Sequence, residues 1–353
     1  MKIEYREYQQ RSIEKALYHF RKGQKSVLLE SPVGSGKTVM GLKIVQALLE
    51  RAPEKLRCAW VAPRHYLLNQ LMESNRYFDL PIKTVSMFTK PEKAEHFDIV
   101  VIDEAHHEAT SSFIDLYTQM NPQYLLGLSA TPLRTDKIKL AFSATVNECN
   151  IHQLIQEGFL SRFNSYIIEN FTPETVAKHY LARKKEWGKT LVFMPTLEQC
   201  AKFQNLIIQA GEKCLFIQSG NELSRRKFEN SEEPLAVNCQ LLTEGFDMPE
   251  LQTVFVRSSS RLPMIQMAGR VLRKHPDKKI ANIVQAKNTR FQAKKMAEPE
   301  EIFHWRKDRF IALKGQTNIL NNTLRETLNR RKNRPERNEV QMKEFDAVLH
   351  TAV

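Results

Sequence analysis

The sequence predicts an α/β protein with two tandem domains, each a parallel sheet flanked by helices, and a helical, basic C-terminal extension. The chain has 353 residues, which is long for one hydrophobic core, since domains typically hold about 100–200 residues. Short apolar runs alternate with helix-like segments, the pattern of parallel α/β layers. This alternation starts afresh after a join near residues 145–165.

The first half of the chain contains four apolar runs that we expect to form buried strands. They are residues 26–30, 59–63, 98–104 and 124–130. Helix-like stretches between them include Val39–Arg51 and His65–Asn75. The second half has six further runs, at 166–170, 190–195, 214–218, 235–238, 253–257 and 280–286.

After about residue 291 the strand signal stops and the remaining sequence looks helical. The predicted domains are therefore 1–150 and 151–290, followed by an extension over 291–353. This extension holds 13 Lys/Arg and 9 Asp/Glu, a net charge of +4. We interpret it as a solvated helix followed by a flexible connection.

Composition is ordinary for a globular protein, with 42% hydrophobic and 26% charged residues. No apolar run is long enough to cross a bilayer, and the N-terminus lacks the apolar core of a secretory signal. We therefore expect a soluble, cytoplasmic protein with no membrane association. The five cysteines contain no C-x-x-C pair, which argues against a structural zinc site or a disulfide framework.

Charge favours a polyanionic partner. Lys and Arg number 53 against 40 acids, a net charge of +13 at neutral pH. Between Ser258 and Lys295 there are ten Lys/Arg and one acid, so this stretch alone carries +9. Binding phosphates releases counterions condensed on nucleic acid, which rewards a cationic surface of this kind.

The segment SPVGSGKT (31–38) follows an apolar strand and precedes a helix-forming stretch, the setting in which a P-loop works. Its glycines let backbone N–H groups turn toward phosphate, and the helix N-terminus adds positive potential. Lys37 would reach the β- and γ-phosphates, and the Thr38 hydroxyl would ligate Mg²⁺. Ser31 departs from the general G-x-x-x-x-G-K-[ST] pattern, which begins with glycine. We assign phosphate binding to Gly34, Ser35, Gly36 and Lys37.

A second strand, DIVVIDEAHH, ends in two adjacent acids. An acid at the carboxyl end of a strand beside a P-loop is placed to hold Mg²⁺, which we assign to Asp103. The neighbouring Glu104 could polarise an attacking water.

These residues resemble the superfamily-two helicases, and the resemblance spans roughly residues 3–290. DEAH (103–106) matches the family's second motif, the DEAH box, and SATP (129–132) matches the third. The resemblance implies RecA-like domains, ATP and Mg²⁺ as cofactors, and nucleic-acid-stimulated ATP hydrolysis. It further implies Gln9 of YREYQQ at the adenine edge, Arg64 near the nucleic-acid backbone, and Ser129 and Thr131 coupling the two sites.

The second domain repeats the agreement. LLTEGFDMPEL (241–251) resembles the fifth motif, with Thr243 facing nucleic acid and Gly245 and Asp247 nearer the nucleotide. QMAGRVLR (266–273) is similar to the sixth. By this resemblance three residues face the γ-phosphate across the cleft, namely Gln266, Arg270 and Arg273. Arginine suits that role because its permanent charge and planar fork stabilise charge on a transferred phosphoryl group.

Within the superfamily, TEGFDMPEL and IQMAGRVLR resemble the compact DNA-directed branch of UvsW-type and RadD-type helicases. The expected activity is ATP-driven movement on, or remodelling of, DNA, with branched DNA favoured. Contacts to backbone phosphates are expected to dominate, because a motor must tolerate every sequence.

Three alternatives stay open. An RNA helicase would use the same lobes, since discrimination depends on contacts to the 2′-hydroxyl. A clamp or remodelling switch would hydrolyse ATP without separating strands, and the small size of the chain favours it slightly. A motor subunit could serve an accessory partner such as a nuclease. A non-catalytic binding module is disfavoured, because Lys37, Asp103, Glu104 and both arginines are present.

Overall fold

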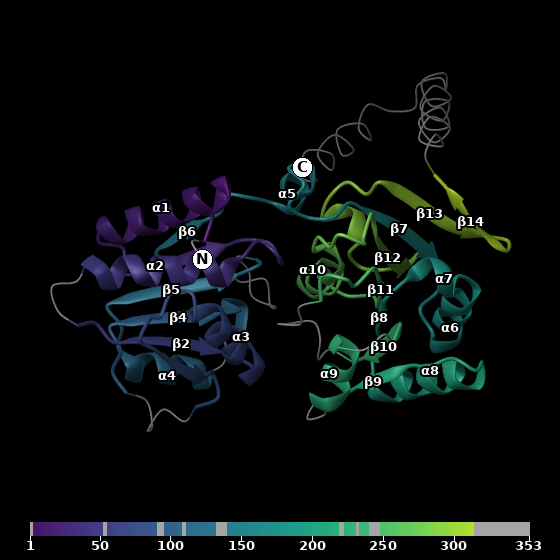
Figure 1. Ribbon diagram of the computed structural model, residues 1–353, viewed down its shortest axis with the longest axis horizontal. Helices are drawn as coiled ribbons and strands as arrows, with labels where there is room; N and C mark the ends of the chain where they lie inside the picture. The colour runs from purple at the N-terminus through teal and green to yellow at the C-terminus, as the bar shows by residue number, and fades with distance from the viewer. Residues whose placement is uncertain are drawn as a thin grey trace, which may run out of the picture. The chain divides into compact units, whose positions relative to one another are not determined.

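The computed structural model describes residues 3–51, 55–89, 95–107, 111–131, 140–218, 222–230, 233–239 and 248–313, and leaves the side chains of 111–115 and 222 undescribed. By its contacts, the chain divides into one unit of residues 1–310 and a second of 311–353. Two sheets organise the first unit (Figure 1). No helix in the described ranges has the length and apolar character needed to cross a membrane.

The first sheet has six strands in the order β3-β2-β4-β5-β1-β6, and every pairing within it is parallel. Its inner strands are buried on both faces, which is why they read as continuous apolar runs in the sequence. The strand bounds are β1 Ser26–Glu30, β2 Cys58–Ala62, β3 Ile82–Ser86, β4 Ile99–Asp103, β5 Tyr124–Ser129 and β6 Ala144–Val146.

Helices cover both faces of this sheet (Figure 1). On one face, α1 (Glu7–Arg21), α2 (Lys37–Arg51) and α3 (His65–Asn75) bury their apolar stripes in a core that includes Trp60. On the other face, α4 (Ser111–Met120) packs through its C-terminal half, and Ala105 of the short 3₁₀ helix η2 (Ala105–His107) belongs to the same core. Amphipathic spacing explains this placement, since each helix presents one apolar stripe to the sheet.

The second sheet has eight strands in the order β14-β13-β7-β12-β11-β8-β10-β9. The pairings from β13 through β9 are parallel. The bounds are β7 Phe163–Ile168, β8 Thr190–Phe193, β9 Leu215–Ile217, β10 Leu235–Asn238, β11 Thr253–Val256, β12 Ala281–Ala286, β13 Glu301–Arg306 and β14 Arg309–Ala312. The chain passes from one sheet to the other through α5 (Ile151–Gln156).

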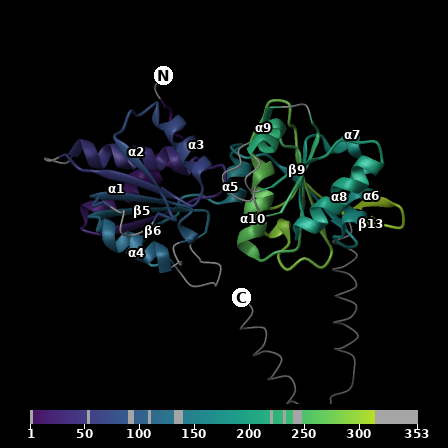
Figure 2. The same ribbon diagram turned by 90° about the horizontal axis from the view of Figure 1, so that it is seen from below.

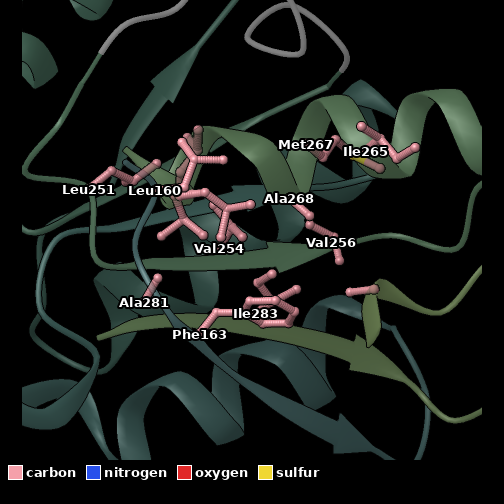
Figure 3. Packing of buried hydrophobic residues seen from close by; sticks show 14 of the residues in the cluster. Leu160, Phe163, Leu251, Val254, Val256, Ile265, Met267, Ala268, Ala281 and Ile283 are labelled. Carbon is pink, nitrogen blue, oxygen red and sulfur yellow. The ribbon is translucent and has the colours of Figure 1, made fainter. Parts of the chain in front are cut away.

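Each face of the second sheet also has its own core. Helices α6 (Pro173–Ala182) and α8 (Leu197–Gln209) lie side by side on one face (Figure 2). The other face packs against α10 (Arg261–Gly269), as the close view of Leu160, Val254 and Ile265 shows (Figure 3). The remaining helices are α7 Lys184–Trp187, α9 Glu222–Asn230, α10 Arg261–Gly269, η4 Arg270–Leu272 and η5 Ala293–Lys295.

The structure confirms the predicted α/β class with tandem parallel sheets, and it differs from the sequence prediction in two respects. Two strands of the first sheet, β3 and β6, were not predicted. The expectation that strands end near residue 291 is wrong, because β13 and β14 follow there and extend the second sheet. The rings of Tyr166 in β7 and Phe303 in β13 stack with centroids 4.7 Å apart, so the added strand is packed as well as paired. The rest of the predicted extension, 314–353, lies outside the described residues.

Candidate active site

The predicted P-loop lies at the carboxyl end of β1, a strand placed between β5 and β6, and it leads directly into α2. Gly34 and Gly36 have φ angles of +81° and +84°, which L side chains rarely adopt. The loop therefore needs glycine at both positions. The carboxyl ends of the parallel strands, where this loop lies, are the place at which open α/β sheets bind ligands.

Serine side chains stabilise the loop from within. Ser31 Oγ donates to Ser35 Oγ at 2.6 Å, and Ser35 Oγ donates to the Pro32 carbonyl at 2.7 Å. Ser31 Oγ also lies 3.3 Å from Cys149 Sγ. Ser31 is the residue that departs from the general motif, and the structure gives its hydroxyl a definite place in the turn. Sequence reasoning did not assign a role to Cys149, whose position depends on tertiary contacts alone.

Two side chains of helix α1 donate hydrogen bonds to the P-loop. Tyr8 Oη and Gln9 Nε2 both donate to the Ser35 carbonyl, at 2.8 and 2.9 Å. Gln9 Oε1 accepts from the backbone N–H of Arg6 at 3.0 Å. A Cβ at Gly36 would lie 2.6 Å from Gln9 Nε2, so the loop approaches this amide closely. The structure thus places Gln9 against the P-loop, and its contact with adenine stays a prediction. Tyr8 was missed, although the YREYQQ segment contains it.

Lys37 begins α2 and extends its ammonium group toward the carbonyl oxygens of Ser31 and Pro32, at 3.2 and 3.4 Å. Burial lowers the pKa of this ammonium group, while the nearby carboxylates of Glu104 and Asp103 act to raise it. The lysine thus lies between the loop and the acid pair. Thr38, the next residue, is half-buried in the first turn of the helix.

Asp103 ends β4 and Glu104 follows it directly, so the acid pair lies at the carboxyl end of the strand as predicted. Burial and the adjacent Glu104 carboxylate raise the pKa of Asp103, because two neighbouring buried acids resist carrying charge together. Glu104 has a φ angle of +52°, which is uncommon for a residue with a Cβ and concentrates at functional sites. Its N–H donates to Asp103 Oδ1 at 3.0 Å. Within the described part of the chain, the buried Glu104 Oε2 accepts no hydrogen bond.

These observations fit Mg²⁺ and a nucleoside triphosphate. Asp103 and Glu104 offer buried carboxylate oxygens, the hard ligands that Mg²⁺ prefers. Asp103 and Thr38 are the residues that would hold the metal ion. The P-loop amides and Lys37 would hold the phosphates.

The second domain contributes two arginines to the same place. Arg270 is 4% exposed, and burial lowers the pKa of Arg273 to about 10. The positive charges of both arginines act to lower the pKa of Lys37. A Cβ at Gly34 would lie 3.4 Å from Arg273 Cγ, so this side chain passes over the loop. Three cationic side chains from both domains thus converge, as binding of a polyphosphate requires.

Residues between the two domains fix the arginine segment. Ser161 N donates to the Leu272 carbonyl at 2.7 Å, and Ser161 Oγ donates to the Arg273 carbonyl at 3.0 Å. Leu160 forms an isolated antiparallel bridge with Arg273. Nothing in the sequence marks Ser161, because its role depends on a partner more than 100 residues away.

A hydrogen-bonded chain links His106 and Ser129 of the first domain to the second domain. Gln266 Nε2 lies 3.1 Å from His106 Nε2, and His106 Nδ1 lies 3.4 Å from Ser129 Oγ. Ser129 Oγ accepts from the Thr131 N–H at 3.2 Å. His106 Nδ1 is also 3.5 Å from Glu104 Oε2. The structure therefore places Gln266 on His106, whereas its contact with a γ-phosphate stays a prediction.

The predicted nucleic-acid residues are only partly described. Arg64 is exposed and immediately precedes α3. It lines a surface hollow of about 480 Å³ at the ends of β2 and β3. Thr243, Gly245 and Asp247 lie outside the described residues, so their predicted roles stay predictions.

Comparison with known proteins supports this interpretation. The family model described as type III restriction enzyme, res subunit, matches residues 2–84 and 80–134. The chain is 24% identical to the putative ATP-dependent helicase IRC3 of Saccharomyces cerevisiae, over 79% of this chain and 51% of the relative. It is 23% identical to putative helicase 22 of a Sulfolobus islandicus filamentous virus, over 71% of this chain and 58% of the relative.

A third relative, the DNA 3′-5′ translocase XPB2 of Sulfurisphaera tokodaii, is 29% identical over 38% of this chain and 32% of its own length. Among solved structures, the ATP-dependent type ISP restriction-modification enzyme LlaBIII bound to DNA matches with a TM-score of 0.60 and 17% identity. That match covers 81% of this chain and 28% of the LlaBIII chain.

The chain spans 51% and 58% of the length of the first two relatives, and so only part of their full length. The matches agree with the motif order, the two parallel sheets and the convergence of P-loop, acid pair and arginines. On this evidence, the chain is similar in sequence and fold to the superfamily-two helicases.

Proposed function

We propose that this chain hydrolyses ATP and uses the cycle to move on or remodel DNA. The observation that carries the proposal is the approach of Arg273 to the glycine turn that precedes Lys37, in a site whose charges also include Arg270, Asp103 and Glu104. A site built from both domains couples their separation to the state of the nucleotide. The net charge of +13 supports a nucleic-acid partner.

Each residue would have a definite task. Bound ATP with Mg²⁺ supplies the phosphoryl group and the electrophilic activation. Lys37 and the two arginines would stabilise negative charge that develops on the γ-phosphoryl oxygens. Glu104, whose Oε2 has no hydrogen-bond donor among the described residues, would orient water and accept its proton. The His106–Gln266 contact would connect that carboxylate to the second domain.

DNA is favoured over RNA by two relatives whose names specify DNA, the XPB2 translocase and the restriction-modification enzyme bound to DNA. An RNA helicase is the second candidate, since the same two domains can bind either polymer and selectivity depends on contacts to the 2′-hydroxyl. A clamp that hydrolyses ATP without separating strands is the third.

The test is steady-state ATPase activity of the purified chain alone and with single-stranded, forked and four-way DNA, or RNA of matched length. Lys37→Met should lower turnover by about 10²–10³, the cost of removing one preorganised charge donor. Lys43→Met is the matched control, because Lys43 lies on the same helix and contacts Gln46 instead of the site. Glu104→Gln should keep ATP binding and lose turnover.

The polymer comparison separates the candidates. Stimulation by DNA, greatest with branched DNA, supports the proposal and leads to a strand-displacement assay. Stimulation by RNA alone replaces DNA with RNA. A Lys37→Met protein as active as its Lys43→Met counterpart contradicts the assigned site.

A further inference from the structure

A turn closed by hydrogen bonds to Ser86 follows β3. Phe88 N donates to Ser86 Oγ at 3.3 Å, and Thr89 N donates to the Ser86 carbonyl at 2.9 Å. Between them, Met87 N donates to the Ala62 carbonyl at 3.0 Å, and the Met87 side chain is only 1% exposed. Because Met87 is held inward, Phe88 is directed outward by a fixed turn.

Phe88 is 68% exposed, whereas the other phenylalanines with described side chains are buried or half-buried. A single exposed apolar side chain is common on protein surfaces. This one is distinguished by its surroundings. It lines the 480 Å³ hollow that also contains Arg64, and the full set of lining residues is Pro63, Arg64, His65, Ser86, Phe88 and Thr89. No carboxylate belongs to that set.

The hollow lies at the same edge of the first sheet as the candidate active site. Strands β2 and β3 pair in parallel with Ala62 opposite Ser86, and both end there. The P-loop and the acid pair follow the carboxyl ends of β1 and β4 in the same parallel sheet. A polymer bound along this edge would therefore pass close to groups that respond to ATP.

The chemistry of the hollow matches one nucleotide. Arg64 offers a permanent cation, and Ser86 and Thr89 offer hydroxyl groups, the side chains that commonly bind phosphate. Phe88 offers a flat aromatic face, on which any base can stack without sequence preference. Paired bases within a duplex are already stacked on their neighbours, so only an unpaired base can use such a face.

We propose that this hollow binds a nucleotide of a single strand, with its phosphate at Arg64 and its base stacked on Phe88. This inference rests on the proposed function and specifies it further, because it makes single-stranded nucleic acid the polymer held by the first domain. Phe88 is then a binding residue that the family resemblance did not assign.

The experiment measures the affinity of fluorescent oligothymidylate for the full chain by anisotropy, at several salt concentrations. Phe88→Ala should weaken binding by about 10- to 100-fold, the range for losing one base–aromatic stack. Phe88→Trp should keep the affinity and Phe88→Leu should not, because leucine retains apolar bulk without the aromatic face. Tyr77→Ala is the matched control, since Tyr77 is 67% exposed and outside the hollow.

An oligonucleotide of abasic sugar-phosphate units provides the decisive comparison. Binding of this oligonucleotide should be equally weak for the parent chain and Phe88→Ala. Arg64→Ala should reduce the slope of log affinity against log salt by about one, whereas Phe88→Ala should leave that slope unchanged.

Two outcomes overturn the inference. One is a Phe88→Ala protein that binds oligothymidylate as well as the parent chain, as expected if Phe88 instead contacts another protein. The other is an equal loss on normal and abasic strands. Failure of the proposed function looks different, because then no polymer would bind the parent chain or stimulate its ATPase activity.

Discussion

Substituting the two residues of the His106–Gln266 contact tests whether hydrolysis depends on the joining of the domains. The Gln266 side chain comes from α10 of the second domain and the His106 side chain from η2 of the first. Their nitrogens are 3.1 Å apart, and the two residues are only 5% and 3% exposed. The perturbations are Gln266→Ala, His106→Ala and the double substitution.

The expected magnitudes follow from burial and from the remaining partners. Removing Gln266 leaves a buried ring nitrogen without this partner, at a cost of about 1–3 kcal/mol. If this cost raises the free energy of the state in which the domains are in contact and not that of the free enzyme, kcat/KM for ATP falls by roughly 5- to 150-fold. His106→Ala should cost more, because His106 also approaches Ser129 and Glu104 at 3.4 and 3.5 Å.

The assay is a double-mutant cycle on nucleic-acid-stimulated ATPase activity, with urea unfolding of each protein to separate catalysis from stability. The double variant should be little worse than His106→Ala, giving a coupling of about 1 kcal/mol or more. Gln204→Ala is the control. Gln204 donates to the Cys214 carbonyl within the second domain, so its effect should add independently to that of His106→Ala. Additive effects of Gln266→Ala and His106→Ala would refute the reasoning.

Three further predictions concern the second arginine, the first core and a buried histidine. Arg273→Ala should reduce kcat by about 10³-fold or more while changing ATP affinity much less, because an arginine finger acts chiefly on the transition state. Steady-state turnover and stopped-flow nucleotide binding measure the two effects, and equal losses of kcat and ATP affinity would contradict this role. Gly127→Ala should lower the free energy of unfolding by about 1–3 kcal/mol, since its Cβ would lie 2.3 Å from the Phe142 ring. Adding Phe142→Leu to that variant should restore stability, as measured by thermal unfolding. Burial lowers the pKa of His179 despite the opposing hydrogen bond to the Glu169 carboxylate. Near the ordinary histidine pKa of about 6.5, the unfolded chain therefore binds more protons than the folded protein, and the free energy of unfolding should fall as pH drops through that region. His179→Gln should flatten this pH dependence, and an unchanged slope would show that other groups cause it.

The sequence predicted the parts of the molecule that depend on local signals. The bounds of β1, α3 and β10 agree with the expected segments, because each combines a clear apolar run or stripe with marked ends. The P-loop and the acid pair were found for a similar reason. Glycine, lysine and threonine at fixed spacing describe one continuous turn, and that turn has the expected backbone conformation.

What the sequence could not supply depends on distant partners. Strand β3 is only partly buried along its length and β6 has three residues, so neither leaves a strong pattern. Tyr8 and Ser161 act through hydrogen bonds to loops far away in the chain. Such contacts become visible only after the sheets have placed the loops together.

Strand β13 also affects how the protein can be shortened. A chain cut at residue 290 would retain every predicted motif, yet it would lose the strand that pairs with β7 from Asn164 to Ile167. The main-chain groups along that side of β7 would then be open to pairing with another molecule, and Tyr166 would lose its stacked ring. Such a fragment would tend to aggregate during expression despite an intact ATP site. A soluble fragment should therefore extend at least through Ala312.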